Sequence, residues 1–251
     1  MKLVIGHLYY DLMNLYGENG NIKVLEYQLK NQGINVDVKK LSLDDKIDFS
    51  KLDLIYIGCG TEKNRNIVIK DLLKYKKEIK DYFKENKFFL VTGNALSLFG
   101  KYIEEKDNKK INALNIFDFH TKCEQTRIVK EVNIECCFLK DNLLGFINKS
   151  DNIYDKDSKL IEYGIYKNNF YGTYLLGPIL ARNPEFMEYF ITNLVLFKDK
   201  KYKLKPFNKE LDEEAYLDYI AFKNSWKNFQ LFFIYKILVS QLNYLYKISS
   251  K

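Results

Sequence analysis

The first hundred residues alternate short apolar runs with stretches of helical spacing, and this alternation restricts the fold more than any other feature of the chain. The clearest run is Phe88–Val91, four apolar residues in succession, as in strands buried on both faces of a parallel sheet. Further strands are predicted at Leu3–Ile5, Val36–Leu41 and Leu52–Ile57. Helical periodicity covers Asn21–Gly33 and Asn64–Glu85. The pattern predicts a doubly wound α/β sheet.

The loops that follow these strands are the expected place for a ligand. Open α/β sheets bind their ligands beyond the carboxyl ends of the strands. The loops concerned cover residues 11–20, 58–64 and 92–94. We therefore expect one site that draws on all three.

The second half of the chain has a different pattern. Shorter strand-like runs occupy residues 114–174, among them Ile128–Phe138 and Leu143–Ile147, and the chain is mostly helical after Pro178. We divide it into a domain at 1–204 and a C-terminal helical extension at 205–251. Within the extension, Leu211–Phe222 is predicted to be an acidic helix.

The segment Phe229–Tyr246 is long and very apolar. Lys236 and several polar residues interrupt it, and about 18 residues fall short of a membrane span, so no transmembrane segment is predicted. An apolar surface of this size is normally buried against another surface. The parent domain, a partner or second copy of the chain, and a membrane surface are the three candidates.

Composition excludes several classes of function. Lys+Arg total 40 against Asp+Glu 33, a net charge of +7, but the excess is lysine, and base or phosphate readers favour arginine; nucleic-acid binding is not expected. The chain has two histidines and no C-x-x-C spacing, so we expect no bound metal. No cofactor is expected either. The N-terminal apolar run is too short for a signal peptide. We expect a cytoplasmic protein whose cysteines are reduced: Cys59, Cys123, Cys136 and Cys137.

A series of motifs resembles one known family. Tyr10–Ile22, with the sequence YDLMNLYGENGNI, resembles the opening motif of the GatD-like (CobB/CobQ-like) class I glutamine amidotransferases, which pair with a Mur-ligase-like MurT subunit to amidate a peptidoglycan precursor. Four further matches follow in the same order: Ile57–Gly60, Leu114–Phe119, Leu144–Asn148 and Gly172–Leu180. The resemblance implies an α/β fold, a flavodoxin-like class I glutamine amidotransferase domain with a mixed central sheet. It also implies a cell-wall role as a complex subunit.

The catalytic pair of that family is missing from the matching positions. The chemistry needs a cysteine nucleophile on a tight turn between a strand and a helix, and a histidine that moves protons. Aligned backwards from Gly100, the cysteine position holds Gly93, and the histidine position in the last motif holds Leu176. Thr92 precedes the turn, and its side chain should point into the fold. The resemblance therefore implies a pseudoenzyme with no catalytic residue.

Some ligand-binding positions of the family are retained. Arg127 stands where the family has an arginine that contacts glutamine, so it either still binds a glutamine-like ligand or is an ordinary surface arginine. The other candidates for ligand binding are Gly58, Gly60 and Asn94. Lys149 replaces the histidine of the family motif G-F-E-N-H. Arg65, near the glycine-rich loop, is expected to be an exposed helix residue.

Three functions stay open at this point. The first is a non-catalytic amidotransferase homologue that acts as a structural or regulatory subunit, with a MurT-like ligase or another chain as partner. The second is an active enzyme with a relocated nucleophile at Cys59, which would need His120 beside it. The third is a small-ligand sensor that uses Arg127 and the glycine-rich loop.

Overall fold

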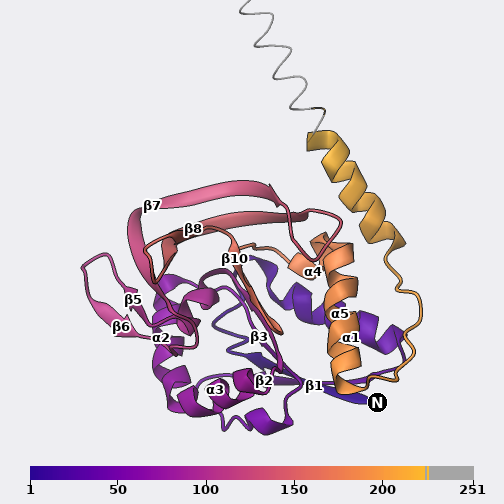
Figure 1. The fold of residues 1–251 in the computed structure, drawn as a ribbon, viewed down its shortest axis with the longest axis horizontal. Coiled ribbons are helices and arrows are strands. Elements are labelled where there is room, and N and C mark those ends of the chain that lie inside the picture. The colour runs from indigo at the N-terminus through magenta and orange to yellow at the C-terminus, as the bar shows by residue number, and fades with distance from the viewer. Residues whose placement is uncertain (224, 226–251) are drawn as a thin grey trace, which may run out of the picture. The chain divides into compact units, whose positions relative to one another are not determined.

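The computed structural model describes residues 1–223 and 225. It divides into two compact units, residues 1–208 and 209–251. The first unit is built on a six-stranded sheet (Figure 1) with the order β10-β11-β4-β3-β1-β2. Its strands are β1 (Lys2–Leu8), β2 (Asn35–Leu41), β3 (Leu54–Ile57), β4 (Phe88–Thr92), β10 (Gly164–Lys167) and β11 (Phe170–Thr173).

The pairing within this sheet is parallel except at one edge. β1 pairs with β2 and β3, β3 with β4, and β4 with β11, all parallel, whereas β10 joins β11 antiparallel. The predicted doubly wound arrangement and the mixed central sheet are thus confirmed. The continuous apolar runs are strands buried on both faces, as in β3 and β4.

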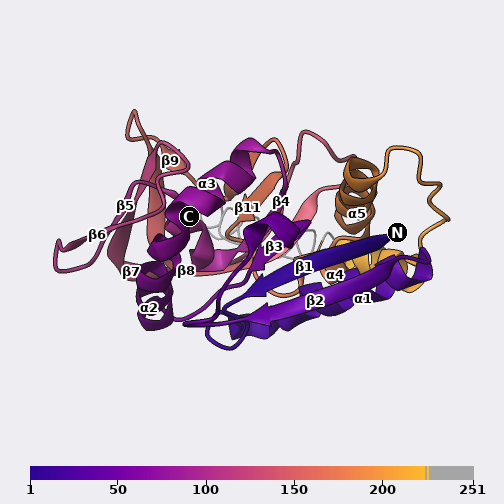
Figure 2. The same cartoon turned by 90° about the horizontal axis from the view of Figure 1, so that it is seen from below.

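Helices cover the two faces of the sheet, as the edge-on view in Figure 2 shows. Ile55 and Val91 pack into a core with α2 (Glu62–Leu72) and α3 (Lys76–Lys84), whereas Tyr56 and Leu90 pack into a second core on the other face. That second core takes its helical side chains from α1 (Asn19–Asn31), α4 (Ile179–Arg182) and α5 (Pro184–Lys198). Alternate residues of each strand therefore stabilise opposite layers.

The segment Asn64–Glu85 is helical as predicted, and the structure divides it into α2 and α3 with a 3-10 turn, Leu73–Tyr75, between them. Tyr75 leaves the helical region at φ −106° and ψ 17°. Its hydroxyl donates to the carbonyl of Asp45 at 2.6 Å, and its ring packs 5.5 Å from that of Phe49. These tertiary contacts outweigh the local periodicity.

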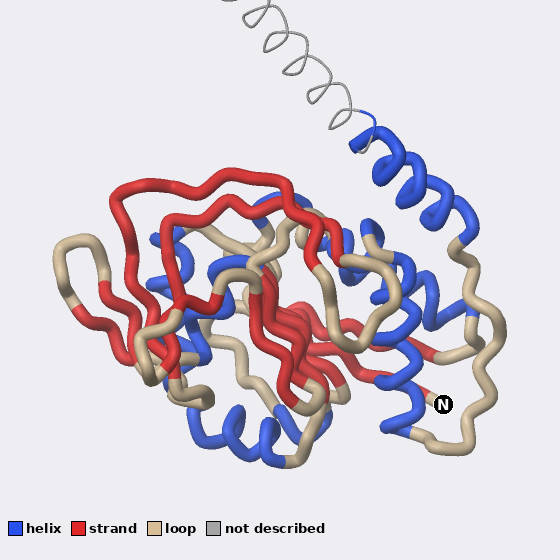
Figure 3. The backbone as a smooth tube through the Cα atoms, turned by 45° about the horizontal axis from the view of Figure 1, so that its top comes forward, coloured by secondary structure: helices blue, strands red, loops and turns tan. Residues whose placement is uncertain are grey.

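A second sheet has the order β6-β5-β7-β8-β9. Its long strands β7 (Phe119–Ile134) and β8 (Leu143–Asp155) form a hairpin that arches over the central sheet in Figure 3. The short strands are β5 (Tyr102–Glu104), β6 (Lys110–Asn112) and β9 (Leu160–Ile161). β7 begins earlier than the predicted Ile128, because Phe119, Thr121 and Cys123 alternate inward at the start of the strand.

The chain from residue 179 to 198 is helical as predicted. Gln28 of α1 and Gln32, which directly follows α1, donate to the carbonyls of Asn208 and Lys205, so the segment after α5 is held against α1. Residues 210–223 are helical, which confirms the predicted acidic helix Leu211–Phe222. Phe229–Tyr246 lies outside the described residues. None of the helices in the described part of the chain is long and apolar enough to cross a membrane.

Candidate functional site

A cavity of about 260 Å³ lies at the carboxyl ends of β3 and β4, below the β7–β8 hairpin. All three loops predicted to carry a site contribute to it. Its lining residues are Leu15, Tyr16, Cys59, Gly60, Thr61, Glu62, Asn94, Arg127, Asn148, Lys149 and Asp151. It is therefore the candidate site.

The turn after β4 has the backbone geometry of a strained strand-to-helix elbow. Gly93 has φ +61° and begins a 3-10 helix, Gly93–Phe99. A Cβ atom built on Gly93 would lie 2.5 Å from both Cβ and Sγ of Cys59 and 2.7 Å from Cδ2 of Leu176. The two positions that the resemblance assigns to the catalytic pair are therefore neighbours. Neither carries a nucleophile or a base.

Cys59 fills the volume that a side chain at residue 93 would take. Its thiol lies 3.5 Å from Oδ1 of Asn94 and 3.7 Å from the carbonyl of Gly60. Burial raises the pKa of this thiol to about 12, so it stays protonated and unreactive at neutral pH. His120 is stacked between Tyr102 and Tyr154 and does not line the cavity.

Asn94 joins two of the loops. Its Oδ1 accepts from the N–H of Gly60 at 3.0 Å, and its Nδ2 donates to the carbonyl of Gly60 at 2.7 Å. Both residues line the cavity, as does Arg127. Gly58 instead lies deeper, where an added Cβ would meet Glu18 at 2.8 Å. The structure thus brings together three of the four predicted ligand-binding residues.

A chain of polar contacts runs along one side of the cavity, and we name its five residues the mouth belt. Asn148 donates from Nδ2 to the hydroxyl of Tyr16 at 2.8 Å. Arg127 donates from Nη1 to Oδ1 of Asn148 at 2.9 Å and from Nη2 to Oε1 of Glu62. Ser150 donates to the same oxygen of Glu62 at 3.1 Å. The belt joins the loop after β1, β7, β8 and the first residue of α2.

Arg65 is a correction to the sequence-based expectation, because its side chain is fully buried and not exposed. Its Nη2 lies 2.5 Å from Oε1 of Glu105, and its Nη1 lies 3.7 Å from Oδ2 of Asp151. Burial raises the pKa of Asp151, and the Arg65 guanidinium opposes this shift. Buried charges of this kind persist only when paired, and the partners come from the second sheet.

Lys149 is also buried beside the cavity. Its Nζ lies 3.7 Å from the centroid of the Tyr174 ring and donates to the carbonyl of Glu162 at 3.3 Å. Burial lowers the pKa of this ammonium to about 8. A cation thus replaces the imidazole that the family motif would supply here.

Glu18, from the opening motif, lies fully buried beneath the cavity. Tyr56 donates to its Oε2 at 2.6 Å, and Thr92 donates to the same atom, so Thr92 points inward as predicted. Oε1 of Glu18 has no hydrogen-bond partner. Burial raises the pKa of this carboxyl to about 7.

Sequence reasoning missed Tyr16, Glu62, Asn148 and Asp151 as members of the site. Glu62 had a usable signal, because it directly follows the glycine-rich loop at the start of a predicted helix. Asn148 lies in β8, 132 positions from Tyr16, and no local pattern reports such a contact.

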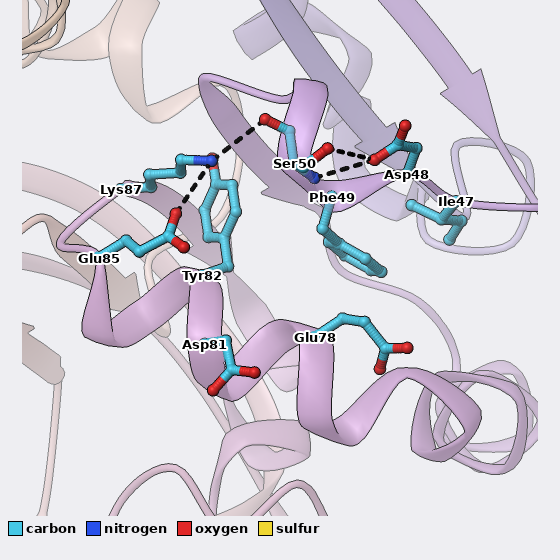
Figure 4. A pocket seen from close by; sticks show the side chains of 9 residues that line it. All are labelled: Ile47, Asp48, Phe49, Ser50, Glu78, Asp81, Tyr82, Glu85 and Lys87. Carbon is cyan, nitrogen blue, oxygen red and sulfur yellow. Dashed lines mark hydrogen bonds and ion pairs between the residues drawn. The ribbon is translucent and has the colours of Figure 1, made fainter.

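Two other cavities, each of about 250 Å³, lie away from this site. Figure 4 shows one at the amino ends of β3 and β4, where Asp48, Glu78, Asp81 and Glu85 are among its lining residues. The other is apolar and lies between the loop at residues 134–138 and the edge strand β10. Neither cavity lies beyond the carboxyl ends of the parallel strands, where ligands of this fold class bind.

Comparison with known proteins identifies the family. Residues 4–184 match the CobB/CobQ-like glutamine amidotransferase domain. The chain belongs to this family. It is 30% identical over 231 residues to the Staphylococcus aureus (strain N315) lipid II isoglutaminyl synthase (glutamine-hydrolyzing) subunit GatD, covering 85% of this chain and 91% of that protein.

A second GatD relative gives the same result. The lipid II isoglutaminyl synthase (glutamine-hydrolyzing) subunit GatD of Streptococcus pneumoniae (strain ATCC BAA-255 / R6) is 27% identical to this chain over 236 residues, with 88% of each chain covered. Among solved structures, a crystal structure of a glutamine amidotransferase is 13% identical with a TM-score of 0.48, covering 76% of this chain and 98% of that one. The predicted membership of the GatD-like class I glutamine amidotransferases is confirmed.

Proposed function

We propose that this chain is a non-catalytic GatD-like subunit of a lipid II amidating complex, which binds a MurT-like ligase subunit and does not itself hydrolyse glutamine. The observation that carries the proposal is the meeting of Gly93 and Leu176 at the elbow after β4. A nucleophile and a base are absent where the family chemistry needs both.

The expected loss of rate is very large. Removing one member of a nucleophile–base unit costs on the order of a millionfold in rate, because the members act together. The remaining groups at the elbow, Leu176 and the buried thiol of Cys59, supply neither a base nor a thiolate. What remains is a folded cavity with polar groups at its mouth.

Binding of a glutamine-like ligand is the second candidate function. The cavity keeps about 260 Å³, and Arg127 lies on its rim from β7. A guanidinium can hold a carboxylate with two parallel hydrogen bonds. A bound ligand would then regulate the complex without being consumed.

The test measures glutamate release from glutamine by the chain alone and together with a MurT-like ligase subunit from the same organism. We expect no release above buffer in either case, and co-elution of the two proteins. Release that disappears in Cys59→Ala would instead establish the relocated nucleophile. Absence of co-elution would contradict the partner, leaving self-association through Phe229–Tyr246 as the alternative.

A further inference from the structure

Glu62 forms an ion pair with Arg127, whose guanidinium is the group that a carboxylate ligand of the cavity would use. We infer that Glu62 is an internal competitor for Arg127, so that a ligand with a carboxylate binds only by displacing Glu62. This inference rests on the second candidate function above and adds the determinant of its ligand selectivity.

The two residues come from different layers of the fold. Arg127 lies on β7 of the second sheet, and Glu62 is the first residue of α2 beside the central sheet. Both terminal nitrogens of Arg127 have partners, since Nη1 donates to Asn148 and Nη2 to Glu62. Each terminal nitrogen keeps a second N–H, but the positive charge of the guanidinium is already paired with the Glu62 carboxylate.

Glu62 is held in place by more than Arg127. Ser150 donates to it at 3.1 Å, and its position in the first turn of α2 places a negative charge at the positive end of the helix dipole. Burial alone would raise the pKa of this carboxyl, but its own backbone N–H, Arg127 and Ser150 outweigh burial and lower the pKa. The carboxylate is thus ionised at neutral pH.

The pair is nevertheless displaceable. The side chains of Arg127 and Glu62 are 42% and 39% exposed, so water screens their attraction. A ligand that adds contacts inside the cavity can exchange its carboxylate for that of Glu62. Exposed pairs of this kind shift such an equilibrium by at most about fivefold, so the competition reduces the apparent affinity of such a ligand by about two- to fivefold.

The inference predicts selectivity by charge. A carboxylate ligand competes with Glu62, whereas a neutral amide at the same position does not need the guanidinium. L-glutamine and L-glutaminamide differ in this group alone, and they are therefore the two probes.

The experiment measures binding of both probes by calorimetry to wild type, to Glu62→Gln and to Glu162→Gln. Glu162 is the matched control, because it pairs with Lys130 at 2.8 Å on the second sheet with side chains 42% and 46% exposed, and it does not line the cavity. We expect Glu62→Gln to bind L-glutamine about two- to fivefold more tightly. Its binding of L-glutaminamide, and both affinities of Glu162→Gln, should equal those of wild type.

Adding Arg127→Ala to Glu62→Gln should remove the gain in affinity for L-glutamine. The inference is overturned if Glu62→Gln gives no gain, if L-glutaminamide gains equally, or if the gain survives Arg127→Ala. Lack of binding by every variant also overturns it. None of these results affects the non-catalytic subunit role, which is tested separately by glutamate release and co-elution.

Discussion

Cys59 and Gly93 share one volume in this protein: the Sγ atom of Cys59 lies 2.5 Å from the position that a Cβ on Gly93 would take. The sulfur therefore comes from the loop after β3 and not from the elbow after β4. A side chain at residue 93 and a cysteine at residue 59 exclude each other. Any variant that alters one position has to be designed with the other.

Gly93→Ala should destabilise the fold by about 2 to 5 kcal/mol. The left-handed backbone at φ +61° costs a non-glycine residue roughly 1–2 kcal/mol, and overpacking against Cys59 adds roughly 1–3 kcal/mol. Urea unfolding of wild type, Gly93→Ala, Cys59→Gly and the double variant measures the coupling. We expect Cys59→Gly to recover about 1 to 3 kcal/mol in the Gly93→Ala background. Simple additivity of the two changes would contradict the shared volume.

The sequence predicted the central sheet and the place of the site because both depend on local patterns. The continuous apolar run Phe88–Val91 identified a buried strand, and the glycine at residue 93 marked the turn that follows it. The three loops meet at the cavity because the strands before them are parallel.

The remaining features depend on contacts between distant residues. Arg65 is buried because Glu105 and Asp151 arrive from the second sheet, 40 and more positions later. The mouth belt likewise joins Tyr16 to Asn148 across 132 positions. Periodicity reports which face of an element is apolar, and it carries no information about such pairs.

Glu18→Gln should remove a loss of stability that occurs as the pH rises. The pKa of this carboxyl is raised from 4.5 to about 7 by burial, so the folded state holds the proton more tightly than the unfolded state. Glu18 therefore contributes about 3 kcal/mol to the free energy of unfolding below pH 4.5, and this contribution is lost as the pH rises through 7. Unfolding of wild type and Glu18→Gln at several pH values measures it. Glu26→Gln, on the helix α1 that directly follows Glu18, is the control, and its stability should follow that of wild type.

His7→Phe should remove a loss of stability that occurs as the pH falls. Burial, followed by the charge of Lys40, lowers the pKa of His7 from 6.5 to about 4. The contribution of His7 is fully present above pH 6.5 and is lost as the pH falls through 4, again by about 3 kcal/mol. Its Nε2 has no hydrogen-bond partner, and the charge of Asp11 offsets only part of the effect of burial on this pKa.

The two groups meet at Tyr56, whose hydroxyl donates to Glu18 and whose ring lies 5.1 Å from that of His7. Their opposite slopes should nearly cancel in wild type between pH 4.5 and 6.5. Each single variant then reveals the slope of the other group: stability of Glu18→Gln should rise with pH, and stability of His7→Phe should fall. His120→Gln, which keeps both groups, should follow wild type. Equal slopes in all four proteins would contradict the pKa shifts.

Arg65→Ala should destabilise the protein by about 3 to 5 kcal/mol, because it leaves the buried carboxylate of Asp151 without its guanidinium and removes the ion pair with the half-buried Glu105. Arg65→Lys should recover only part of this loss, since an ammonium cannot reach both carboxylates as a planar fork does. Lys63→Ala, at an exposed position of the same helix, is the control and should change stability by less than about 0.5 kcal/mol. The measurement is the free energy of unfolding in urea at pH 7. An Arg65→Ala protein as stable as Lys63→Ala would mean that the guanidinium does not pair with these carboxylates.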